Sequence, residues 1–155
     1  MNRFKTIILL LAGVILGVSC DKNEPVVEYL EVTPNNIAGE WKQTGWNGNP
    51  LDTGTYFYID FVRKDKKFTM YQNFDSIADM PHIVTGTYAI EYIEEKGAVI
   101  SGKYDYDEGF WAYAYVVEEL TKTSMTWKYV VKYDDGTEKT GVKKFVRCNI
   151  PAIYK

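Results

Sequence analysis

The chain has 155 residues, a formal net charge of −3 and an aromatic content of 15%. This length fits one domain after removal of a leader, and the acidic balance excludes the broad basic surface that nucleic-acid binding requires. His82 is the single histidine, and no Gly-rich phosphate loop, Cys-x-x-Cys or Gly-x-Ser-x-Gly pattern occurs. These features predict a protein that is not an enzyme and that binds no metal and no cofactor.

The N-terminal segment has the pattern of an export signal. Arg3 and Lys5 precede an apolar run over residues 6–18, which is shorter than the roughly 20 residues needed to span a bilayer. The run ends in Leu16-Gly17-Val18-Ser19-Cys20, which resembles a bacterial lipobox. This resemblance implies cleavage before Cys20 and attachment of acyl chains to its sulfur. An ordinary signal peptide or an uncleaved anchor is the alternative.

The resulting division is a lipoprotein signal peptide over 1–19, a lipid anchor and tether over 20–33, and a folded domain over 34–155. The expected location is the cell envelope, on an outer-membrane lipoprotein that faces the periplasm or the cell surface. The membrane is then a partner through the lipidated Cys20. The other cysteine, Cys148, is expected to be small, partly buried and at the end of the last strand.

One helical turn is expected before the first strand. Thr33 can cap the free N–H groups of a helix, and Pro34 suits the first helical position, where no N–H is needed. A plain type I turn is the alternative.

The rest of the chain alternates between apolar and polar residues and is interrupted by turn signals such as Asp134-Asp135-Gly136. Eight strands are predicted, over residues 41–46, 56–62, 68–74, 83–93, 98–103, 110–117, 125–132 and 138–147. Short connections favour antiparallel neighbours, and closure removes the two exposed edges of such a sheet. The predicted fold is therefore all-β, an eight-stranded antiparallel up-and-down β-barrel. A sandwich with one long connection is the alternative.

Three segments resemble the lipocalin family. They are Gly39-Glu40-Trp41 at the first strand, Tyr115-x-Val117-x-x-Leu120 followed by Met125-x-Trp127, and Phe145-Val146-Arg147 at the last strand. The chain is also similar in plan to the small lipocalin-like domains of Bacteroidetes lipoproteins. The resemblance implies structural roles for Gly39, Trp41 and Arg147, with the guanidinium stacked over the indole, and a helical turn across the closed end of the barrel.

The thirteen Tyr, seven Phe and four Trp favour a cavity that is lined by rings. Alternation along the predicted strands marks an inward-facing set that would bind a small apolar or amphipathic ligand: Phe57, Ile59, Tyr88, Trp111, Tyr113, Tyr115, Trp127 and Tyr129. The same side chains would alternatively fill the barrel, which would make the protein a structural or interaction module of an envelope complex.

The acidic segment Tyr104-Asp105-Tyr106-Asp107-Glu108-Gly109 vaguely resembles a calcium loop. It lacks the further ligands and the distant Glu of such loops, so a solvated hairpin is expected there.

Overall fold

The computed structural model describes residues 26–74, 81–106 and 109–155. The predictions for the leader, Cys20, Asp107 and Glu108 therefore lie outside the described residues. No helix within the described ranges is long and apolar enough to cross a membrane.

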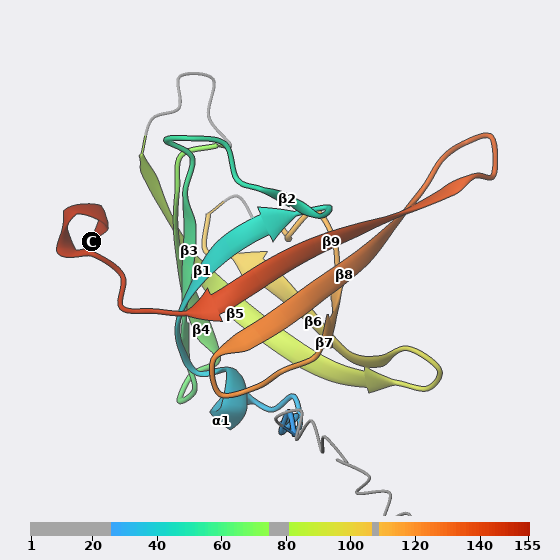
Figure 1. The fold of residues 1–155 in the computed structure, drawn as a ribbon, viewed down its shortest axis with the longest axis horizontal. Coiled ribbons are helices and arrows are strands. Elements are labelled where there is room, and N and C mark those ends of the chain that lie inside the picture. Colours follow the sequence, from blue (N-terminus) through green and yellow to red (C-terminus); the bar gives the residue numbers. More distant parts are fainter. Residues whose placement is uncertain (1–25, 75–80, 107–108) are drawn as a thin grey trace, which may run out of the picture.

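The predicted helical turn is present as α1 (Pro34–Ile37). Thr33 is extended, and its hydroxyl accepts a hydrogen bond from the Asn36 N–H at 3.2 Å, which satisfies one free donor of the first turn. The turn lies across one end of the sheet (Figure 1) and closes that end.

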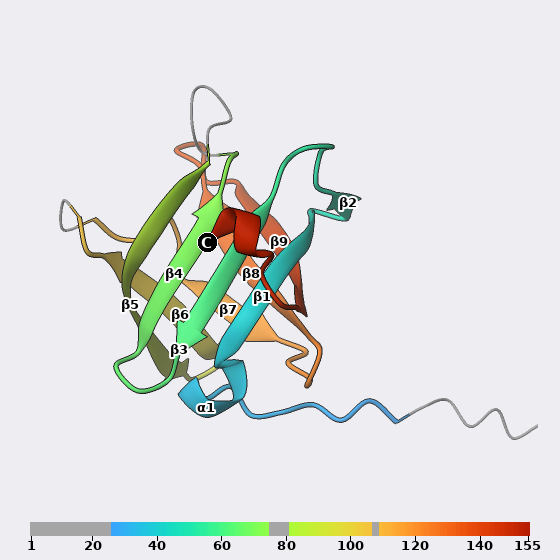
Figure 2. The ribbon, with the colours of Figure 1, turned by 90° about the vertical axis from the view of Figure 1, so that its left-hand side faces the viewer.

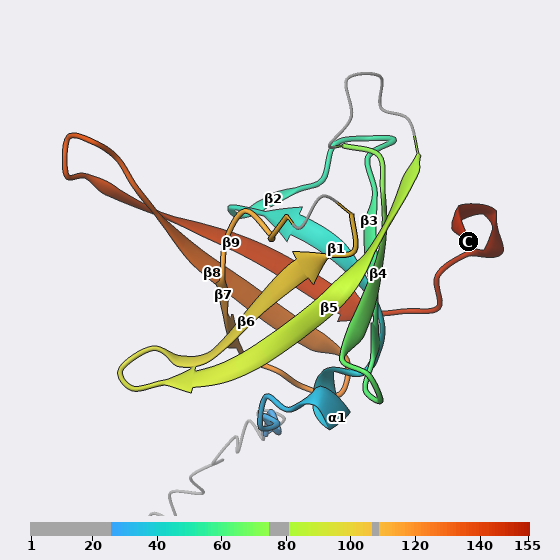
Figure 3. The same ribbon diagram turned by 180° about the vertical axis from the view of Figure 1, so that it is seen from behind.

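Nine strands follow, of which eight form the barrel. Their bounds are β1 (Gly39–Trp46), β2 (Asn49–Pro50), β3 (Phe57–Val62), β4 (Lys67–Gln72), β5 (His82–Ile93), β6 (Gly97–Tyr104), β7 (Tyr115–Glu118), β8 (Ser124–Lys132) and β9 (Glu138–Arg147). Each barrel strand pairs antiparallel with the next, and β1 also pairs with β9. The prediction of a closed, antiparallel, up-and-down barrel is confirmed. The β5–β6 and β8–β9 hairpins extend beyond the barrel (Figures 1 and 3).

The prediction of a strand over 110–117 is wrong for residues 110–114. Phe110 makes one isolated bridge to Lys103, and the Trp111 N–H donates to the Gly102 carbonyl at 2.9 Å. The Trp111 ring then lies against Gly102, in the space that a Cβ there would occupy. A ring laid on the neighbouring strand leaves no room for regular pairing, so β7 begins only at Tyr115.

The short strand β2 lies where a break was predicted. Asn47 and Gly48 have φ of 50° and 84°, as in a tight hairpin turn, and they return the chain antiparallel along the end of β1. The Asn47 N–H donates to the Val142 carbonyl, and the Asn47 side-chain oxygen accepts from the Val142 N–H, both at 2.8 Å. Asn47 thereby continues the contact between β1 and β9 beyond Trp46.

Arg147 ties the closed end of the barrel together. Its guanidinium lies 4.2 Å from the centroid of the Trp41 ring. It also donates hydrogen bonds to the carbonyls of Asn36, Ala38 and Lys122 at 2.6–2.9 Å. The Trp41 indole N–H donates to the Ile37 carbonyl at 2.8 Å. One side chain thus joins the last strand to α1, to the start of β1 and to the loop before β8.

A C-terminal strap, residues 148–155, crosses the outer surface of β3 and β4 (Figure 2). The Tyr154 ring packs at 4.2 Å from that of Tyr56 and 5.3 Å from that of Tyr58. The Glu40 carboxylate fastens the strap because it accepts hydrogen bonds from the Ile150 N–H and, at 2.6 Å, from the Lys155 ammonium. These donors, the ammonium first, lower the pKa of Glu40.

We expect Arg147→Ala to lower the free energy of unfolding by about 2–4 kcal/mol, because it removes charged hydrogen bonds and a cation–π contact. Lys144→Ala, on the exposed face of the same strand, should cost much less. Urea denaturation of both variants measures the difference, and equal losses would contradict the role of Arg147.

The strap predicts a dependence of stability on pH. The pKa of Glu40 is lower in the folded state than its ordinary value of 4.5, so its carboxylate stabilises the fold above that value. This contribution disappears as the pH falls through the folded-state pKa. Glu40→Gln should therefore be less stable than the wild type at neutral pH and equally stable in strong acid.

The exposed Glu91 on β5 provides the matched control, because Glu91→Gln should leave the pH profile unchanged. Asp60 acts in the opposite direction, since burial and then the charge of Glu40 raise its pKa. Its pKa should fall in Glu40→Gln, which makes the measured difference a lower bound. Parallel stability curves for wild type and Glu40→Gln would contradict the proposed strap contact.

Candidate functional site

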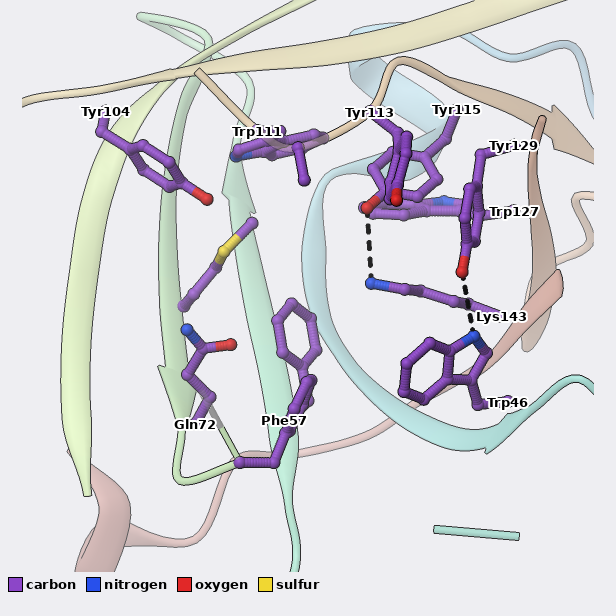
Figure 4. A pocket seen from close by; sticks show the side chains of 13 residues that line it. Trp46, Phe57, Gln72, Tyr104, Trp111, Tyr113, Tyr115, Trp127, Tyr129 and Lys143 are labelled. Atoms are coloured by element: carbon purple, nitrogen blue, oxygen red, sulfur yellow. Dashed lines mark hydrogen bonds between the residues drawn. The ribbon is translucent and has the colours of Figure 1, made fainter. Parts of the chain in front are cut away.

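The barrel holds a cavity of about 250 Å³ at the end opposite α1. It lies between β3 and β4 on one side and β8 and β9 on the other, and the loop between β6 and β7 covers part of it (Figure 4). Its described lining consists mainly of rings: Trp46, Phe57, Met70, Gln72, Phe74, Tyr104, Trp111, Ala112, Tyr113, Tyr115, Trp127, Tyr129 and Lys143.

Trp127 forms the floor of this cavity and is 1% exposed. Its ring centroid lies 5.5 Å from that of Trp111, 5.0 Å from Tyr115 and 4.6 Å from Phe145. Below it, toward α1, Phe61 packs edge-on against Tyr88 at 5.0 Å. The half of the barrel near α1 is therefore filled, and the other half is open.

Two glycines allow rings to lie flat against the barrel strands. A Cβ on Gly102 would lie 2.1 Å from the Trp111 ring, and one on Gly141 would lie 2.1 Å from the Tyr129 ring. Tyr129 and Gly141 are direct cross-strand partners. The Tyr113 ring stacks on that of Tyr129 at 4.2 Å. The shape of the cavity thus depends on side chains that are absent as much as on those present.

Polar groups are few, and they lie toward one side. The Lys143 ammonium donates to the Tyr115 hydroxyl at 3.4 Å, and the Trp46 indole N–H donates to the Tyr129 hydroxyl at 3.1 Å (Figure 4). On the other side, the Trp111 indole nitrogen is buried and has no hydrogen-bond partner within the described ranges. Gln72 Nε2 lies 2.9 Å from His82 Nε2.

The structure brings six of the sequence-predicted ligand-binding residues together around this cavity: Phe57, Trp111, Tyr113, Tyr115, Trp127 and Tyr129. Tyr113 is 36% exposed and lies at the opening rather than inside. Ile59 and Tyr88 are buried in the filled half and do not line the cavity. Burial raises the pKa of the Tyr88 hydroxyl. Alternation identifies inward side chains, but it does not show where along the barrel the packing stops.

Two important lining residues were not predicted, Trp46 and Lys143. The pairing of β1 with β9 shifts by one residue between Gln43 and Gly45, and this bulge turns Trp46 to the same side as Gln43. Gly45 was the signal available in the sequence. Lys143 shares its face of β9 with Phe145 and Gly141, so period two marked it as inward, but its charge suggested an exposed position.

Other candidate residues lie elsewhere. Cys148 is half-buried directly after β9, and burial, followed by the charge of Glu40, raises the pKa of its thiol. The thiol is therefore held protonated, which disfavours a nucleophilic role. No group of three or more potential metal ligands occurs among the described residues, and Asp107 and Glu108 are outside them.

No protein family model matches the chain, and no curated protein sequence matches it. Among solved structures, it is similar to bovine odorant binding protein in complex with a selenium-containing odorant, with 16% identity over 80% of this chain and 78% of that chain and a TM-score of 0.43. Lobster apocrustacyanin A1 is similar at 17% identity over 77% and 66% of the two chains, with a TM-score of 0.47. The barrel itself is defined by its strand pairing.

Proposed function

We propose that this protein binds a small apolar or amphipathic molecule in the ring-lined cavity and does not catalyse a reaction. The observation that carries this proposal is the division of the barrel, because the packed half below Trp127 ends at an open space. Mostly apolar walls with a few polar groups are typical of small-molecule sites. The volume, about 250 Å³, lies just below the usual range of roughly 300–1,000 Å³, which favours a small ligand.

The described lining contains no His, Cys, Asp or Glu. The general acid and base groups that most enzymes use are thus missing from that set. This composition supports binding without catalysis.

We further propose that lipidated Cys20 tethers the protein to the outer membrane of the cell envelope. The described chain begins at Val26 and reaches the barrel beside α1, where the Leu30 N–H donates to the Leu120 carbonyl at 2.7 Å (Figure 2). A tether at the closed end leaves the cavity at the opposite end, directed away from the membrane. That orientation suits a protein that exchanges ligand with the surrounding fluid.

Titration with the apolar fluorophore N-phenyl-1-naphthylamine tests binding. The wild type should bind it saturably with quenching of Trp fluorescence. Ala112→Phe, which adds bulk at a lining position, should weaken binding about tenfold, since overpacking costs about 1–3 kcal/mol.

Ala114→Phe is the matched control, because Ala114 is exposed on the same loop and is absent from the described lining. Its affinity should equal that of the wild type. Absence of saturable binding by the folded protein would contradict the proposal and favour an interaction module.

Intact-mass analysis of membrane-extracted protein tests the tether. The mature chain should begin at Cys20 and carry acyl chains, and Cys20→Ser should be released from the membrane fraction. A mature N-terminus at another position, or unchanged membrane attachment of Cys20→Ser, would contradict lipidation at this residue.

A further inference from the structure

The cavity contains a positive charge among its rings. Lys143 reaches it from β9, and its ammonium lies 5.1 Å from the centroid of the Tyr115 ring and 5.8 Å from that of Phe57. Figure 4 shows this side chain extending across the cavity toward Tyr115. None of the described lining residues is acidic. Any ligand that fills the space therefore meets a cation and no described carboxylate.

The hydrogen-bonding groups are biased toward donors. The Tyr129 oxygen accepts from the Trp46 indole, so the Tyr129 hydroxyl hydrogen remains directed elsewhere. The buried Trp111 indole is a donor only, and within the described ranges it has no acceptor. The lining therefore offers ammonium, hydroxyl and indole hydrogens, whereas its described acceptors are hydroxyls and the Gln72 amide. Such a site complements a ligand that brings acceptor oxygens.

Desolvation favours an anion over a neutral ligand. Lys143 is half-buried, so a ligand that enters the cavity displaces water from the ammonium. A neutral apolar molecule does not replace those interactions, whereas a carboxylate replaces them with charge-assisted hydrogen bonds. The whole chain has a net charge of −3, so its overall field does not attract anions. Selection of an anion would be local to Lys143.

We propose that the ligand is a small organic carboxylate whose acidic group binds Lys143 and the Tyr115 hydroxyl. Its apolar body packs on Trp127, Trp111 and Phe57, the rings at the floor and sides of the cavity. This inference rests on the proposed ligand-binding function and specifies the class of ligand.

Two probes that share a ring system test it by isothermal titration calorimetry: 2-naphthoate, which is anionic, and 2-naphthalenemethanol, which is neutral. The wild type should bind naphthoate about tenfold more tightly or better, as expected for a charged hydrogen bond. Lys143→Met keeps the length and removes the charge. It should bring the two affinities together and leave that for the alcohol within about twofold of wild type.

Lys144→Met is the control, because it removes the same charge from the exposed face of β9 and should preserve the preference. Circular dichroism verifies that each variant is folded. Should Lys143→Met fail to fold, Tyr115→Phe and the salt dependence of naphthoate binding to the wild type decide. The proposal requires a reduced preference in the first and weakening by salt in the second.

Equal affinities of the two probes for the wild type would overturn the anion preference and leave the binding function intact. An unchanged preference in folded Lys143→Met would overturn the assignment of the acidic group to that residue. If neither probe bound the folded wild type, both the inference and the proposed function would be contradicted.

Discussion

Closure of β1 against β9 is the constraint on which the rest of the structure depends. An open antiparallel sheet would leave two edges with unpaired backbone groups, and this pairing removes both. The same ladder runs from Trp41 opposite Arg147 to Trp46 opposite Lys143. Its first pair ties the closed end, and its last pair supplies two residues of the cavity. Stability and the candidate site are therefore organised by one pair of strands.

The barrel combines two kinds of packing. Near α1, large side chains interlock around Trp127 and fill the interior as in any close-packed core. In the open half, rings lie against Gly102 and Gly141, and β6 pairs with β7 at only two positions. Fewer ladder hydrogen bonds hold this half, so it is the part that can open locally at least cost. A ligand would enter through the less stable half without disturbing the tie at Arg147.

The fold was largely predictable from the sequence, because period-two patterns and turn residues specify neighbours in a meander. The hairpin at Asp134-Asp135-Gly136 and the capped turn after Thr33 are local features, and both are present as predicted. The site was less predictable. The bulge that redirects Trp46 and the contact of Trp111 with Gly102 arise from pairing between distant residues. Local alternation holds no record of such contacts, so it misplaced the end of one strand and the lower boundary of the cavity.

The C-terminal strap explains a pattern that alternation alone left ambiguous. Tyr56-Phe57-Tyr58-Ile59 is a continuous apolar run, and all four residues are buried. Phe57 and Ile59 face the interior, whereas Tyr56 and Tyr58 pack under the strap against Tyr154. A strand that is covered on both faces reads as an unbroken apolar run. Because Phe57 lines the cavity, the contact of Glu40 with Lys155 on the outside of the barrel also steadies one wall of the site within.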